Sequence, residues 1–110
     1  MDFTYLDTMA DGDVELRETM LAMLLEEIPA EIDEMRRAYD LRDWDTLWKT
    51  AHKHKSTLAF VGQPDMLAAV RRIEVDAKEG RAPESLQDPL RILERHQSDV
   101  LMAVQKELGG

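Results

Sequence analysis

The chain has 110 residues and a formal net charge of −9, with 44% apolar and 34% charged residues. This composition fits one soluble domain over residues 1–110, with a modest core, better than a disordered chain. The acidic balance argues against nucleic acid or an anionic membrane as the partner, because both attract clustered basic residues. The lack of cysteine excludes disulfides, a thiolate nucleophile and a Cys-based metal site. No stretch is apolar enough for a signal peptide or a membrane span, so we expect a cytoplasmic protein.

The first third of the chain predicts two helices. A short helix over residues 3–10 is followed by Asp11-Gly12-Asp13, which can end it and cap the next one. A long helix then runs from Val14 to about Tyr39, and Pro29 should kink it without splitting it, since the apolar spacing keeps its phase. The apolar residues of this helix, three and four positions apart, are Leu16, Met20, Met23, Leu24, Ile28, Ile32, Met35 and Tyr39.

The rest of the chain predicts three more helices. One runs from Trp44 to about Phe60 with Asp43 as its cap, and another covers residues 66–79. The last runs to Leu108, with Pro89 near its start and Asp88 as its candidate cap. Four long helices with short joints predict an all-α fold, an antiparallel four-helix bundle with the short N-terminal helix over one end.

The stretch Ala51-His52-Lys53-His54-Lys55-Ser56 holds two of the three histidines. Residues two apart on a helix lie about 200° from each other around its axis, so these two side chains cannot grip one metal ion. No acidic residue between Trp48 and Val61 could complete a ligand set, and only His96 could join from the last helix. The pattern therefore predicts no metal site.

The two histidines belong to different faces of their helix. His54 shares a stripe with Leu47, Ala51 and Leu58, which predicts a core histidine that is hydrogen-bonded to a neighbour. His52 lies on a second stripe, rotated by about 100°, and should be exposed. An exposed histidine among lysines is by itself an ordinary solvated surface.

Two features set the surface around His52 apart. Residues 49–55 hold three lysines and no acid in an acidic chain, and Ser56 and Ala59 beside His52 are small. A mostly neutral imidazole is nucleophilic, and a nearby lysine can bind an arriving anion. The chain has no glycine-rich phosphate loop and no Ser or Cys paired with a base. The surface is therefore suited to receiving a phosphoryl group, not to removing one from ATP.

These residues resemble the histidine-containing phosphotransfer (HPt) domain family. The family motif reads roughly A-H-x-L-K-G-S with a glycine ten residues after the histidine, which Ala51, His52, Lys55 and Gly62 match; Thr57 nearly matches the serine. Two further stretches match, residues 3–13 before the first long helix and residues 39–44 before the motif helix. Ser56 stands in place of the motif glycine and His54 in place of a core leucine.

The resemblance implies a phosphorelay intermediate of a two-component system, a phosphocarrier and not an enzyme. His52 would exchange a phosphoryl group with aspartates of response-regulator receiver domains, and Lys55 would steady the phosphate. The receiver would supply the Mg²⁺ and the acidic pocket, so this chain needs no cofactor. A hybrid sensor kinase is a further expected partner, and we expect a monomer. The expected docking residues are Lys49, Lys53, Ser56, Ala59 and Gly62.

Three other interpretations remain open from the sequence. The dimerisation helix of a sensor kinase resembles H-E-x-x-x-P, but Lys53 follows His52 and no proline comes at the required offset. A helical protein–protein adaptor with incidental histidines is the main alternative. A metal- or haem-binding bundle is the third. The sequence names neither the cognate kinase and receiver nor the direction of phosphate flow.

Overall fold

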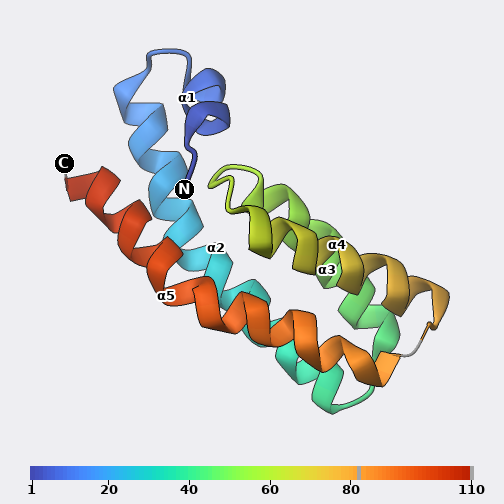
Figure 1. Cartoon of the computed structure of the whole chain (residues 1–110). Coiled ribbons are helices and arrows are strands. Elements are labelled where there is room, and N and C mark those ends of the chain that lie inside the picture. The colour runs from blue at the N-terminus through green and yellow to red at the C-terminus, as the bar shows by residue number, and fades with distance from the viewer. Residues whose placement is uncertain (82, 110) are drawn as a thin grey trace.

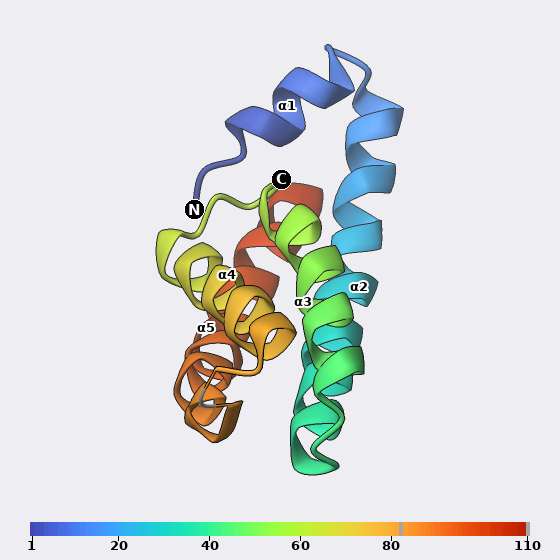
Figure 2. The same ribbon diagram turned by 90° about the vertical axis from the view of Figure 1, so that its right-hand side faces the viewer.

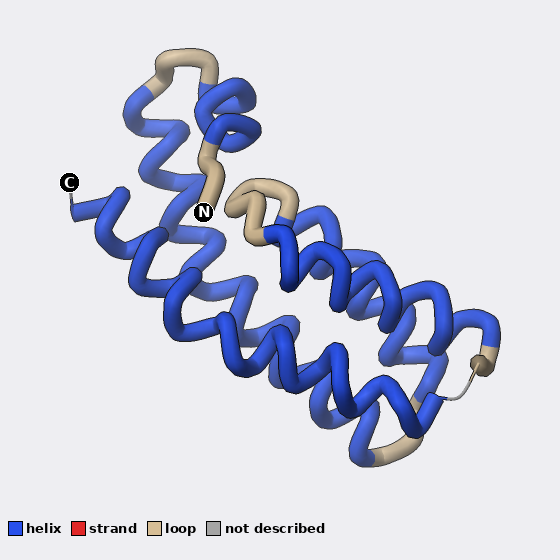
Figure 3. The backbone as a smooth tube through the Cα atoms, in the orientation of Figure 1, coloured by secondary structure: helices blue, strands red, loops and turns tan. Residues whose placement is uncertain are grey.

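The computed structural model describes residues 1–81 and 83–109, and these residues form helices and short connections with no strand (Figure 3). The helices are α1 (Thr4–Ala10), α2 (Val14–Asp40), α3 (Trp44–Leu58), α4 (Pro64–Glu79), the 3-10 helix η1 (Pro83–Leu86) and α5 (Gln87–Gly109) (Figure 1). The predicted all-α fold is confirmed.

The four long helices form an antiparallel bundle. Helix α3 packs between α2 and α4, and α5 packs against both α2 and α4, so the four helices enclose one core. Helix α1 crosses one end of the bundle beside the first turns of α2 (Figure 2). Fully buried side chains from all five helices and the α3–α4 turn fill the core, including Leu6, Leu21, Ile28, Leu47, Leu58, Val61, Met66, Ile73, Leu90, Leu93 and Val104.

Three of the predicted helix details hold and one does not. Asp43 caps α3, because its Oδ1 accepts a hydrogen bond from the Thr46 amide at 3.1 Å. Asp13 caps α2 in the same way, and α2 continues as one helix through Pro29. The prediction that Asp88 caps the last helix is wrong. Helix α5 follows η1 directly and begins at Gln87, so Asp88 lies inside its first turn.

The apolar face predicted for α2 is wrong at its N-terminal end. Leu16 and Met23 are 43% and 49% exposed, whereas Leu21, which was not part of the predicted face, is fully buried. The first turns of α2 extend past α3 and α4, and α1 is the helix that crosses them (Figure 2). Spacing alone predicts which residues share a face, but not where the neighbouring helices stop.

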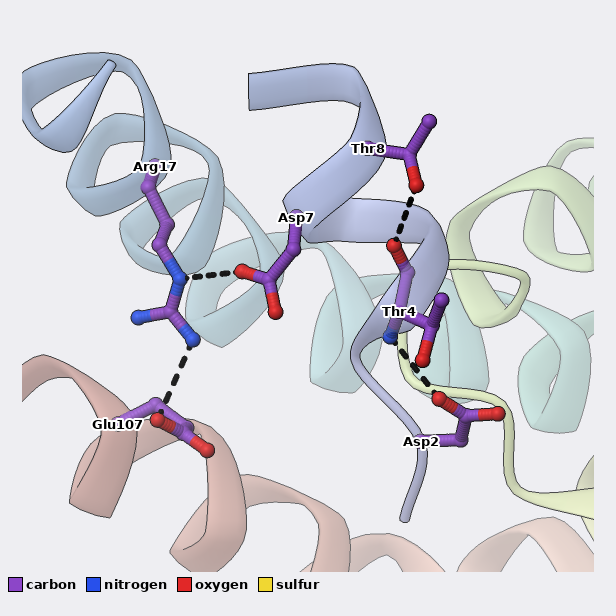
Figure 4. A network of polar contacts seen from close by, with 6 residues as sticks. All are labelled: Asp2, Thr4, Asp7, Thr8, Arg17 and Glu107. Atoms are coloured by element: carbon purple, nitrogen blue, oxygen red, sulfur yellow. Dashed lines mark hydrogen bonds and ion pairs between the residues drawn. The ribbon is translucent and has the colours of Figure 1, made fainter. Parts of the chain in front are cut away.

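Arg17 joins three helices at the capped end of the bundle. Its Nε donates to Asp7 of α1 at 2.6 Å and its Nη2 to Glu107 of α5 at 3.2 Å (Figure 4). The pKa of Arg17 is raised above its ordinary value, mainly by the hydrogen bond to Asp7. The Asp2 carboxylate accepts a hydrogen bond from the amide of Thr4, the first residue of α1, at 2.9 Å (Figure 4). These contacts hold α1 across the end of the bundle.

The turn after α3 is held by the N-terminal segment. The Asp2 amide donates to the Val61 carbonyl at 2.9 Å, and Gly62 follows with a φ of +58°. A Cβ on Gly62 would lie 2.8 Å from the Asp2 carbonyl oxygen. Glycine is therefore required here both by its backbone conformation and by the close approach of Asp2.

Replacing Gly62 with alanine should destabilise the fold more than an equivalent change elsewhere. Gly80 is the matched control, since it also has positive φ, at +69°, but a Cβ there would have nothing within 4 Å. Gly80→Ala should lower the free energy of unfolding by about 1 kcal/mol and Gly62→Ala by clearly more. Urea unfolding measures both. If both variants lose the same free energy of unfolding, disturbing the contact with Asp2 does not destabilise the fold.

Candidate functional site

The burial of one face of α3 determines which of its side chains are exposed. Leu47, Ala51, His54 and Leu58 are all fully buried, as the stripe predicted. Because this stripe points into the core, His52 points outward, and its side chain is 63% exposed. The predicted division of the two histidines between core and surface is confirmed.

A carboxylate from the next helix contacts His52. Oε1 of Glu74, on α4, lies 2.9 Å from Nδ1 of His52. Lys55, one turn after His52, places its Nζ 2.9 Å from Oε2 of the same carboxylate. His52, Glu74 and Lys55 therefore form one connected group, which we call the His52 cluster.

The His52 cluster fixes which imidazole nitrogen is available. A carboxylate only accepts hydrogen bonds, so the neutral ring must carry its proton on Nδ1 and donate it to Glu74. The lone pair is then on Nε2. Burial raises the pKa of Glu74, but the hydrogen bonds from His52 and Lys55 outweigh it and hold that pKa below its ordinary value. Glu74 is thus a carboxylate at neutral pH.

The surface around His52 is less positive than the sequence predicted. Glu74 pairs with Lys55, and Asp45 pairs with Lys49 at 2.8 Å. Asp45 lies one turn before Lys49 on α3, just outside the lysine-rich stretch of residues 49–55. Glu74 lies 22 residues from His52 in sequence, so no local pattern points to it. Two of the three lysines in the predicted positive patch are therefore paired with acids.

The remaining predicted docking residues lie on α3 and in the turn that follows it. Lys53 and Ser56 are exposed and line a groove of about 360 Å³ between α2 and α3, together with Glu27 and Glu34. Ala59, half-buried, follows the last residue of α3. Gly62 forms the turn beyond it. Lys49 lies one turn before Lys53, beside Trp48, with its Nζ 5.8 Å from the ring centre.

His54 forms a buried polar contact with α2. Its Nδ1 lies 2.8 Å from Oε1 of Glu31, and the two side chains are 0% and 5% exposed. Thr57 donates to the other carboxylate oxygen of Glu31 at 3.2 Å. The second ring nitrogen of His54, Nε2, has no hydrogen-bond partner among the residues that the structure describes. The predicted core histidine bonded to a neighbour is confirmed, and its partner is an acid.

His96 lies apart from the other two histidines. Its Nε2 is 3.8 Å from Oδ2 of Asp65, on the side of the bundle where α4 meets α5. Over residues 1–81 and 83–109, no group of three or more His, Asp or Glu side chains is arranged to hold a metal ion. None of the described helices is long and apolar enough to cross a membrane.

Comparison with known proteins decides between the open interpretations. The family model "Hpt domain" matches residues 19–106, which include α3, α4 and nearly all of α2 and α5. The chain belongs to the Hpt-domain family. The crystal structure of the HPT domain from a sensor hybrid histidine kinase from Shewanella is similar to it, with a TM-score of 0.82 and 25% sequence identity. That match covers 99% of this chain and 93% of the other. No curated protein matches the chain.

Family membership gives the chain its general role. The Hpt domain acts in histidine phosphotransfer within two-component phosphorelays, as a phosphocarrier whose partners are response-regulator receiver domains. The HPt fold of this chain brings an exposed imidazole, a lysine and a carboxylate together on one side of α3. The adaptor, kinase-helix and haem interpretations give no account of this match.

Proposed function

We propose that His52 is the phosphoacceptor of this HPt domain, and that residues 1–110 act as one unit. The observation that carries the proposal is the contact between Glu74 and Nδ1 of His52, whose side chain is 63% exposed, since it puts the lone pair of the neutral ring on Nε2. His54 is fully buried, and the side chain of His96 is only 26% exposed, which makes both poorer candidates.

The proposed transfer uses groups from both proteins. The lone pair of Nε2 attacks the phosphorus of a receiver aspartyl phosphate, an N–P bond forms, and the bond to the aspartate oxygen breaks. The receiver keeps its electron pair as a free carboxylate. Nδ1 keeps its proton throughout, so the ring becomes a phosphorylated imidazolium, and the Glu74 carboxylate 2.9 Å away stabilises its positive charge. The reverse reaction follows the same path.

Lys55 is placed to bind the arriving phosphate. Its Nζ lies 2.9 Å from Glu74 and its side chain is 35% exposed, so it can turn from the carboxylate toward phosphoryl oxygens on Nε2. The receiver is proposed to supply the Mg²⁺ and the remaining catalytic groups. The chain is proposed to act as a cytoplasmic monomer whose docking face around His52 comprises Lys49, Lys53, Ser56, Ala59 and Gly62.

Phosphotransfer from receiver domains tests the proposal. A panel of receivers, charged with a labelled phosphoryl group in the presence of Mg²⁺, is mixed with the folded chain. We expect one acid-labile and base-stable label per chain, and a ³¹P–¹⁵N coupling that places the phosphorus on Nε2 of His52. If the chain is folded but no receiver transfers a phosphoryl group to it, the proposal is contradicted and the adaptor function is favoured.

Removing Glu74 should slow the transfer without unfolding the chain. A charge-assisted hydrogen bond contributes about 1.5–3 kcal/mol, so Glu74→Ala should reduce the transfer rate by roughly ten- to a hundredfold. The wild-type ring should show the Nδ1–H tautomer in ¹⁵N–¹H correlation spectra, and Glu74→Ala a mixture of both tautomers. Glu79 is an exposed acid of the same helix, and Glu79→Ala is the control. It should change neither the transfer rate nor the tautomer of His52.

A further inference from the structure

A second groove lies on the side of the bundle where α4 and α5 run antiparallel (Figure 1). It has a volume of about 410 Å³. Its apolar lining comes from both helices and comprises Ala68, Ala69, Pro89 and Ile92. Its charged lining comprises Arg72, Arg95, His96 and Asp65, and Arg72 lies 3.6 Å from Asp76 and His96 lies 3.8 Å from Asp65. The groove therefore combines an apolar floor with a charged edge on which Arg95 has no described ion-pair partner.

The arginines of this edge lie in an acidic chain. The chain carries a net charge of −9, and the groove between α2 and α3 is lined by Glu27, Glu31 and Glu34 together with Lys53. Exposed Arg95 lies one turn after exposed Arg91 on α5, and no ion pair links either to another described residue. Such arginines are free to attract an anionic group of another molecule.

The groove is separate from the His52 cluster. Arg72 and Glu74 are two residues apart on α4, so they project about 200° from each other around the helix. Glu74 contacts α3 through His52, whereas Arg72 donates to Ser85 beside the start of α5, at 3.1 Å. A molecule bound in the groove would leave the face with His52 free.

The shape of the groove favours a protein segment over a small ligand. Small-molecule pockets enclose most of their ligand, whereas this groove is open and follows two helices over two turns, from residue 65 to 72 and from 89 to 96. An amphipathic helix can lay its apolar side along such a groove, with its anchors three and four residues apart. Acidic residues flanking those anchors would meet Arg95 and the neighbouring Arg91, and would compete with Asp76 for Arg72.

We infer that the α4–α5 groove docks an acidic amphipathic helix of a partner protein, at the same time as a receiver domain can occupy the His52 face. The partner is recognised by apolar anchors over Ala68 and Ile92 and by carboxylates that pair with Arg95 and compete with Asp76 for Arg72. The inference goes beyond phosphotransfer and does not depend on which histidine is phosphorylated.

A synthetic peptide provides the test. The probe is an 18-residue helix-forming peptide with leucines at helical spacing and glutamates beside them, and its control carries lysines in place of the glutamates. With the ¹⁵N-labelled full chain, the acidic peptide should shift the amide signals of residues 65–72 and 89–96 saturably, more weakly as salt rises. The basic peptide should shift none of them.

Variants in the groove sharpen the result. Arg95→Glu and Ala68→Glu, both at exposed positions, should each raise the Kd of the acidic peptide at least tenfold. Arg37→Glu, at another exposed arginine without a described ion-pair partner, on α2, is the matched control and should leave the Kd unchanged. Phosphotransfer by Ala68→Glu should equal that of the wild type.

Four outcomes would overturn the inference. If the acidic peptide shifts no signals, or shifts them on α2 and α3 instead, the groove does not have this function. If sodium decanoate at the same concentration produces the same shifts, the groove is a site for small anionic amphiphiles. If sedimentation shows a dimer that Arg95→Glu dissociates, a second copy of the chain covers the groove.

Discussion

A chain carrying His52→Gln is expected to take up no phosphoryl group from any receiver domain. Glutamine keeps a similar length and polarity at this exposed position but offers no nucleophilic nitrogen, so the fold should be unchanged and the transfer lost completely. Labelled transfer is measured alongside circular dichroism, which should overlay the wild-type spectrum.

The other two histidines provide the controls. His96→Gln, on the α4–α5 side, should accept phosphate at the wild-type rate. His54→Gln removes a fully buried ring and can destabilise the fold. Phosphotransfer to this variant is therefore measured only in the folded fraction, where the rate should equal that of the wild type. Label that persisted in His52→Gln, or vanished in folded His96→Gln, would place the phosphoacceptor elsewhere.

Replacing only one member of the buried pair of His54 and Glu31 should lower the free energy of unfolding far more than replacing both. His54→Leu leaves the Glu31 carboxylate, 5% exposed, with Thr57 as its remaining side-chain donor. A buried charge that loses its partner destabilises a fold by about 3–5 kcal/mol. The double replacement His54→Leu with Glu31→Leu removes both polar groups, and such exchanges are often neutral or stabilising by about 1–4 kcal/mol.

A double-mutant cycle in urea measures this difference. The sum of the two single losses should exceed the loss of the double variant by several kcal/mol. Thr50 and Glu34 provide the matched cycle, because their side chains also join α3 to α2, at 3.1 Å, but Glu34 is only partly buried. That second cycle should show a coupling of about 1 kcal/mol or less. Additive losses at His54 and Glu31 would mean that the pair is not coupled.

Sequence rules predicted the features that depend on neighbouring residues of one helix. The Asp43 cap, the outward direction of His52 and the burial of His54 all follow from spacing within about three turns. The matching motif around His52 and Gly62 added the family, which the comparisons with known proteins confirm.

The partners of those residues could not be predicted in the same way. Glu74 and Glu31 reach the two histidines from other helices, 22 and 23 residues away, and periodicity does not show which residues of two packed helices stand opposite each other. The exposure of Leu16 depends likewise on where α3 and α4 end, not on the residues around it. Knowledge of the helix register across the bundle is needed for both.

The hydrogen bond from the Asp2 amide to the Val61 carbonyl joins the beginning of the chain to the turn that follows the helix of His52. Local unfolding of residues 1–3 would remove a hydrogen bond from the α3–α4 turn and take the Asp2 carbonyl away from Gly62. The local stability of the C-terminal end of α3 therefore depends on residues 1–3. Changes at positions 1–3, although distant from His52 in sequence, are therefore expected to alter the rigidity of the proposed docking surface.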